Sequence, residues 1–107
     1  MGTFAHTAVI VTMSAEGIIP VHALATQHFG ALATPICPAP NNGFASFAVL
    51  PCGSKLGWDA EQNHRDAIAA FLAKADLCWD QFAVVAFGDC APWAGKGLPT
   101  NADLELF

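Results

Sequence analysis

The sequence predicts an α+β domain of the ferredoxin-like βαββαβ type, in which two helices lie on one face of a four-stranded antiparallel sheet. Short β-branched or aromatic segments, typical of strands, alternate with two longer segments of helical periodicity. Their order is strand, helix, strand, strand, helix, strand, as in the split βαβ arrangement. We assign this single domain to residues 1–90 of the 107 and expect residues 91–107 to form a C-terminal tail that packs on the domain or on a partner.

The first half of the domain contains two strands and one helix. Residues 7–13 are a β-branched run that predicts the first strand. Residues 18–29 form the first helix, because Pro20 suits its first turn and Gly30 follows its end. Residues 33–37 are expected to form the second strand, which contains a proline and therefore lies at an edge of the sheet.

The second half begins with an Asn-Gly turn and a strand at residues 44–50. A loop at residues 51–58 leads into the second helix at residues 59–75, where Asp59 as N-cap and Gln62 three residues later form a capping-box pattern. Residues 82–87 provide the last strand.

The second helix is expected to be amphipathic. Glu61 and Arg65 lie one turn apart and are placed on its exposed face. The residues expected on its buried face are His64, Ile68, Phe71, Leu72 and Ala75.

Right-handed crossovers would arrange the strands in the order 4-1-3-2. The start of the first strand, the ends of the third and fourth strands, the end of the first helix and the start of the second then meet at one end of the sheet. The residues expected to gather there are His6, His28, Cys52, Ser54, Lys55, Trp58, Asp89 and Cys90.

The two faces of the predicted sheet carry similar side chains. Apolar residues occupy both alternating sets of strand positions, and the central strands contain no charged residue. A sheet with one solvated face should alternate apolar with polar residues. We therefore expect another subunit's sheet to cover the second face, with the C-terminal tail as the alternative cover. The residues expected at this interface are Phe47, Val49, Val85 and Phe87.

The composition and net charge of the chain limit the classes of partner that it is expected to bind. The chain is 54% hydrophobic and only 12% charged, against about 25% in typical domains. A net charge of −5 argues against nucleic acid and anionic membranes as partners. No apolar run is long enough for a spanning helix and no signal-peptide pattern is seen, so we expect a cytoplasmic protein. The four cysteines show no C-x-x-C pair, which fits free thiols in a reducing compartment and predicts neither a zinc site nor a cofactor.

The loop at residues 51–58 has the composition of an anion site. Its glycines permit unusual backbone angles, Ser54 and Lys55 add a hydroxyl and a cation, and the amides of a helix start lie just beyond. The pattern is not a Walker loop, so triphosphate hydrolysis is not expected. Trp58 is expected to pack beneath the helix start. The predicted ligand-binding residues are Gly53, Ser54, Lys55, Gly57, Trp58 and Asp89.

A catalytic site is the alternative. Cys52 or Cys90 with His6 or His28 would supply a nucleophile and a base, and the same residue types bind zinc. Neither pattern has a specific spacing, so the sequence favours a protein that is not an enzyme.

The segments Asn-Gly-Phe-Ala-Ser-Phe and Pro-Cys-Gly-Ser-Lys-Leu-Gly-Trp, at residues 42–47 and 51–58, are similar to those of short, largely uncharacterised proteins of bacteriophages and prophage regions. The similarity covers about residues 9–89, and the Gly-Ser-Lys-x-Gly-Trp loop is its most specific part. Acidic residues are usual in that family where this chain has Cys52 and Leu56. The resemblance implies a phage context without an assigned activity.

Together these observations favour a non-catalytic phage accessory protein in the host cytoplasm. As an oligomer, it would engage a host protein or sequester a small anionic ligand. The alternative is a small cysteine- or zinc-dependent enzyme with its site at His6, Cys52 and Cys90.

Overall fold

The computed structural model describes residues 4–55 and 57–88. The elements, in chain order, are β1 (Ala5–Ser14), α1 (Ile18–Phe29), a 3₁₀ turn η1 (Gly30–Leu32), β2 (Cys37–Pro38), β3 (Phe44–Val49), α2 (Asp59–Ala75) and β4 (Phe82–Gly88). The predicted α+β class is confirmed. Asp89, Cys90 and the predicted tail at residues 91–107 lie outside the described residues.

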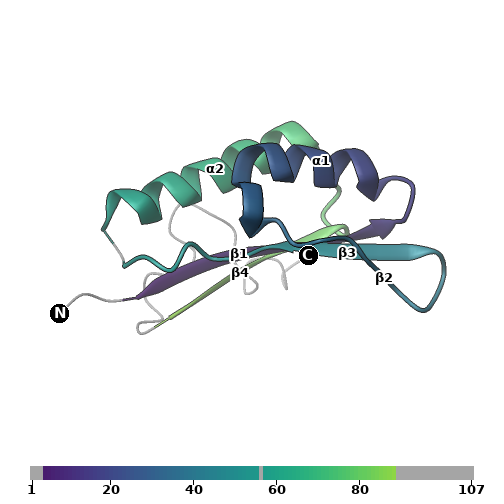
Figure 1. The fold of residues 1–107 in the computed structure, drawn as a ribbon, viewed down its shortest axis with the longest axis horizontal. Coiled ribbons are helices and arrows are strands. Elements are labelled where there is room, and N and C mark those ends of the chain that lie inside the picture. Colours follow the sequence, from purple (N-terminus) through teal and green to yellow (C-terminus); the bar gives the residue numbers. More distant parts are fainter. Residues whose placement is uncertain (1–3, 56, 89–107) are drawn as a thin grey trace.

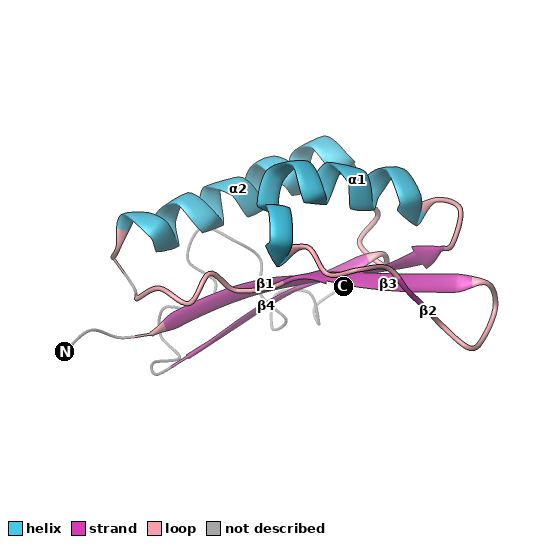
Figure 2. Cartoon of the chain, in the orientation of Figure 1, coloured by secondary structure: helices cyan, strands magenta, loops and turns pink. Residues whose placement is uncertain are grey.

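The four strands form one antiparallel sheet in the order β2-β3-β1-β4, which reads 4-1-3-2 from the β4 edge. Both helices lie on the same face of this sheet (Figures 1 and 2). The register places Val9 of the central strand opposite Val49 on one side and Val84 on the other. The three fully buried valines thus form one row beneath the helices.

Both helices begin and end at the predicted residues, and β1, β3 and β4 differ from prediction by one or two residues at an end. The predicted bounds of the second strand, residues 33–37, differ most from the structure, in which β2 is Cys37–Pro38. Of residues 33–37, only Ala33 and Cys37 pair with β3. The 3₁₀ turn redirects the chain after α1, and the hydroxyl of Thr34 accepts a hydrogen bond from the Ala48 amide at 2.8 Å, a contact that a regular strand ladder would not use.

The core lies between the helices and the sheet. Its sheet side alternates along β1, where Val9 and Val11 are fully buried while Ile10 between them is exposed. The other members of the buried apolar cluster are Ile18, Ala25, Ala45, Phe47, Val49, Ile68, Phe71 and Val84.

The prediction that Phe47 and Val49 belong to a subunit interface is wrong. Phe47 and Val49 do not lie on the second face but are buried beneath the helices. Because Phe47 pairs with Val11 and Val49 with Val9, their side chains point to the same side as these core valines. Apolar residues occupy both alternating sets of β3, so periodicity alone could not choose between them. Ser46, a polar residue of the other set, was the available signal.

The opposite side of the sheet is called the open face below. Its polar positions include Thr12 and Ser46, whose hydroxyls lie 2.8 Å apart. Its members, which alternate with the core residues along the strands, are His6, Ala8, Ile10, Thr12, Phe44, Ser46, Ala48, Ala83, Val85 and Phe87.

Within the described residues, neither helix has both the length and the apolar character that crossing a membrane requires.

Candidate functional site

The loop that joins β3 to α2 is attached to the start of β1. Gly53 and Gly57 have φ angles of +81° and +89°, in the left-handed region. A Cβ atom at either position would meet no atom within 4 Å, so the glycines serve the backbone conformation and not a close approach. Lys55 forms an isolated antiparallel bridge with Phe4, and the Trp58 amide donates to the Lys55 carbonyl at 3.1 Å.

The ammonium group of Lys55 lies between two aromatic rings. Its Nζ is 5.3 Å from the Phe4 ring centroid and 5.6 Å from the Trp58 ring, both within cation–π range. Trp58 is 55% exposed, so the prediction that it packs beneath the helix start is wrong. The indole lies at the surface beside the cation, which makes this an aromatic and cationic surface site.

Ser54 is turned inward. Its side chain is buried, and its Oγ lies 2.9 Å from the sulfur of Cys52. The same sulfur lies 3.7 Å from the carbonyl oxygen of Ala60 in the first turn of α2. The Ser54 hydroxyl is therefore linked to the start of α2 through the Cys52 sulfur.

The start of α2 departs from the predicted capping box. Trp58 is the N-cap residue and provides no side-chain hydrogen bond, while Asp59 is already helical. The Gln62 side chain donates to Asp66 at 2.9 Å instead of reaching back to the cap. Asp59 and Glu61 both lie in the first turn, where carboxylates complement the helix dipole and oppose the binding of a further anion.

Glu61, which was placed on the exposed face of α2, is in fact buried. Its Oε1 is 3.5 Å from Nη1 of Arg65, and the two side chains are 5% and 13% exposed. Glu61 shares the i, i+3, i+7 and i+10 stripe with His64, Ile68 and Phe71, so helical spacing would have revealed its burial.

His64 joins α2 to the sheet. Its Nε2 donates to the Thr7 carbonyl at 3.2 Å, and its ring packs edge-on against Phe29 at a centroid distance of 5.8 Å. Burial lowers the pKa of His64 from its ordinary value of 6.5, while backbone hydrogen bonds to Thr7 and Leu50 and the charge of Glu61 act in the opposite direction. These contacts make His64 a structural link between α2 and the sheet.

Phe4 links several of the residues that were predicted to gather at one end of the sheet, since the Lys55 ammonium group and the His6 ring both contact its ring. Lys55 and Trp58 meet around Phe4, and Ser54 meets Cys52. The His6 ring stacks on Phe4 at 6.1 Å and contacts Phe87 at 5.1 Å. His28 contacts the rings of Phe29 and Phe71, away from the loop.

These contacts bear on the catalytic alternative. The hydrogen bonds of Cys52 go to Ser54 and Ala60, and none joins it to a histidine among the residues described. Within residues 4–55 and 57–88, no three His, Cys, Asp or Glu side chains are grouped so that they could hold a metal ion. Cys90, the other proposed nucleophile, falls outside these residues.

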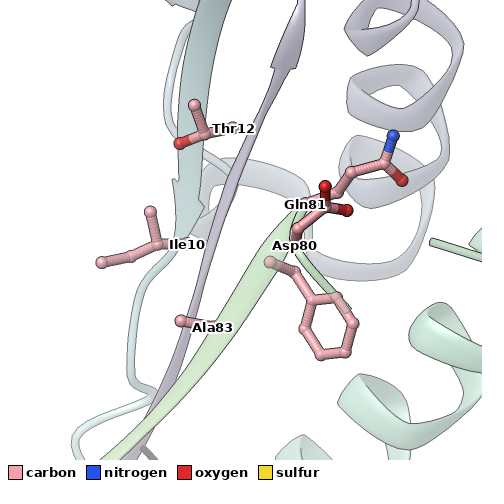
Figure 3. A pocket seen from close by; sticks show the side chains of 6 residues that line it. Ile10, Thr12, Asp80, Gln81 and Ala83 are labelled. Atoms are coloured by element: carbon pink, nitrogen blue, oxygen red, sulfur yellow. The ribbon is translucent and has the colours of Figure 1, made fainter. Parts of the chain in front are cut away.

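The open face includes Val85 and Phe87 of the predicted interface, whereas Phe47 and Val49 lie on the core side of the sheet. Ile10 at its centre is 46% exposed and Phe87 is 50% exposed. A depression of about 210 Å³ lies on it between Ile10, Thr12 and Ala83, bounded by Asp80, Gln81 and Phe82 (Figure 3). Ile10 lies on the central strand, opposite Ala48 on one side and Ala83 on the other, and therefore occupies the centre of the face.

Comparisons with models of protein families, with curated proteins and with solved structures found no match for this chain.

Proposed function

We propose that this chain is a non-catalytic binding protein that works as a homo-oligomer and engages a partner protein through the open face of its sheet. The observation that carries the proposal is that exposed Ile10 and Phe87 belong to strands without any Asp, Glu, Lys or Arg. Large exposed apolar surfaces mark interaction sites in soluble proteins. A charge-free sheet face fits an apolar protein surface better than a charged ligand.

The proposed biological setting follows the resemblance of the Gly-Ser-Lys-x-Gly-Trp loop to phage and prophage proteins. In that setting the chain is an accessory factor in the cytoplasm of a bacterial host, and the partner is a host protein. The fold is proposed to be ferredoxin-like, supported by the element order and by the sheet order β2-β3-β1-β4. The inserted 3₁₀ turn and the two-residue β2 are its departures from a regular example.

Sequestration of a small anionic ligand by the loop is the second candidate. The left-handed backbone at Gly53 and Gly57 and the surface cation of Lys55 support it. Asp59 and Glu61 in the first turn of α2 oppose it electrostatically, and the Ser54 hydroxyl is engaged by Cys52. The open face therefore ranks above the loop.

Site-specific photocrosslinking in a bacterial cytoplasm tests the proposed function. A photoreactive phenylalanine analogue at Ile10 or Phe87 should yield covalent adducts with one recurring protein, because both positions lie on the open face. The same analogue at Ala73, an exposed position on α2, serves as the matched control. Equal adduct patterns at Ala73 and at the open-face positions would contradict the proposal.

A variant sharpens this test. Ile10→Lys places a charge at the centre of the open face, and burying an unpaired charge against a partner is costly. The adducts formed from Phe87 should then disappear, while the circular dichroism spectrum stays unchanged because the side chain faces away from the core. Adducts that persist at full yield would place the partner elsewhere.

A further inference from the structure

The two edges of the sheet differ in whether their outward backbone groups are already hydrogen-bonded. The outer edge of β3 is covered by the chain between α1 and β3. Thr34 donates to the Ala48 carbonyl at 2.8 Å, Leu50 donates to the Leu32 carbonyl at 2.9 Å, and Ala39 donates to the Phe44 carbonyl at 2.9 Å. β2 itself is short and contains a proline, which blocks further pairing. This edge cannot accept another strand.

The hydrogen bonds between β4 and β1 show which backbone groups of β4 bond to β1 and which point outward. The Thr12 amide donates to the Gln81 carbonyl at 2.9 Å, one step beyond the paired residues Val11 and Phe82. Hydrogen-bonded and non-hydrogen-bonded pairs alternate in an antiparallel ladder. The odd residues of β4 therefore bond to β1, whereas the N–H and C=O groups of Phe82, Val84 and Ala86 point outward. No described strand lies beyond β4.

The side chains of β4 do nothing to protect this edge. Residues 82–87 read Phe-Ala-Val-Val-Ala-Phe, a palindrome without a charge, a proline or a glycine. Natural edge strands usually carry a lysine, a proline or a bulge that prevents pairing with another chain. An uncharged segment of β-forming residues at an open edge is instead suited to the addition of a strand.

We propose that β4 pairs antiparallel with β4 of a second copy of this chain, across a two-fold axis that passes close to Val84 and Val85 and runs perpendicular to the sheet. The proposal rests on the proposed function in one respect, namely that the chain works as an oligomer. It adds the residues that join the copies and the geometry of the pair.

The two-fold axis makes this pairing self-complementary, because each residue of one copy meets a residue of the second copy and the reverse contact also occurs. With the axis at Val84, Phe82 lies opposite Ala86 of the second copy and Val84 lies opposite its counterpart, so that large side chains meet small ones. These outward-facing pairs would exchange about six backbone hydrogen bonds, because each hydrogen-bonded pair exchanges two. No like charges face one another in the strand segment.

The perpendicular axis also sets the shape of the dimer. It keeps the helices of both copies on one side of a continuous eight-stranded sheet and both open faces on the other. The partner surface centred on Ile10 is thereby doubled without being covered. Edge pairing is thus compatible with the proposed partner binding, which face-to-face packing of two copies would block.

Amide hydrogen exchange, followed by NMR on the full chain, tests the proposal residue by residue. In an isolated domain, Ala83, Val85 and Phe87 should be protected while Phe82, Val84 and Ala86 exchange rapidly. In the proposed dimer all six amides are protected, and protection of the outward three falls on dilution as sedimentation velocity shows dissociation. Rapid exchange of the outward three in concentrated protein would overturn the proposal. So would protection that persists in a monomer, because another segment of the same chain would then cover the edge.

A substitution at the edge provides the second test. Ala86→Pro removes an N–H that points away from β1, and proline is tolerated in edge strands at such positions. The dimer dissociation constant should rise at least about tenfold, since one backbone hydrogen bond is lost in each of two symmetric pairs. An unchanged dissociation constant in a folded variant would contradict β4 pairing.

A charge pair keeps the inference testable if the proline variant does not fold. Val85→Lys and Val85→Glu should each weaken the homodimer, because like charges then meet near the axis. Mixing the two variants should restore a dimer of one copy of each, and a failure to do so would contradict the proposal. Ile10→Lys should leave the dimer intact while abolishing partner adducts, so that edge pairing and partner binding can fail separately.

Discussion

The two faces of this sheet are built from the same strands and are similarly apolar, but among the described residues the helices cover only one of them. Val9 and Val11 are fully buried beneath the helices, whereas Ile10 between them is 46% exposed. The difference comes from the helices and not from the strands, since both helices lie on one side (Figure 1). Apolar character alone therefore does not identify the core face of a sheet. The polar residues Thr12 and Ser46 identify the other face.

Matched phenylalanine truncations should show the largest difference between the two faces. Phe71→Ala empties a fully buried position and should lower the free energy of unfolding by about 3–5 kcal/mol. Phe87→Ala removes a half-exposed ring from the open face and should cost less than about 1.5 kcal/mol in the monomer. Urea denaturation at low protein concentration measures both. Equal losses would show that the open face is covered within the monomer.

The link between α2 and the covered face should depend on pH. The pKa of His64 is lower in the folded protein than its ordinary value of 6.5, so the unfolded chain binds the proton more readily. The stabilising effect of the neutral ring is complete above pH 6.5 and is lost as the pH falls toward the folded-state pKa.

Denaturation midpoints at pH 7.5, 6 and 5 measure this effect. His64→Gln should be less stable at pH 7.5 and should show a smaller decrease in midpoint between pH 7.5 and 5 than the parent protein. His22→Gln is a suitable control, since His22 lies on α1 and bonds the Thr34 carbonyl instead of the sheet residue that His64 contacts. A decrease in midpoint identical in the parent and in His64→Gln would assign the pH dependence to other groups.

The smallest effect is expected at the surface site around Lys55. Lys55→Ala removes the cation from between Phe4 and Trp58 and should lower stability by about 0.5–1 kcal/mol. Lys55→Arg should retain most of this contribution. Inorganic phosphate, titrated while the Lys55 and Gly57 amide signals are followed by NMR, separates a stacked cation from an anion site. Saturable shifts that disappear in Lys55→Ala would move the loop ahead of the open face as the binding site.

The sequence predicted those parts of the fold that depend on local signals. Pro20 and Gly30 define the ends of α1, and the helix that begins at Asp59 ends at Ala75 as expected. Which side chains of β3 point into the core depends instead on its register with β1. This register is a tertiary property that the residue types of Phe47 and Val49 do not reveal by themselves. The prediction of the second strand was wrong because hydrogen bonds between Thr34 and Ala48 take the place of a regular strand ladder.

The candidate site was predicted less well than the fold. The loop was located correctly, since its glycines have the positive φ angles that their positions suggested. The orientation of Ser54 and the exposure of Trp58 depend on contacts with Cys52 and Lys55 that spacing does not encode. Phe4, which ties Lys55 to the start of β1, carries no motif and was missed.

The central position of β1 has a consequence for the synthesis of the protein. Ala5 pairs with Gly88, so β1, which is synthesised before the other described strands, obtains one of its two neighbours only when the last described strand emerges. At about 5–20 residues per second, the interval between completion of β3 and of β4 lasts roughly 2–8 s. During this interval the nascent chain exposes the β4-binding side of β1, a strand edge on which another nascent chain can pair. Chaperone engagement during translation should therefore be strongest after α2 has emerged and should weaken once β4 has paired with β1.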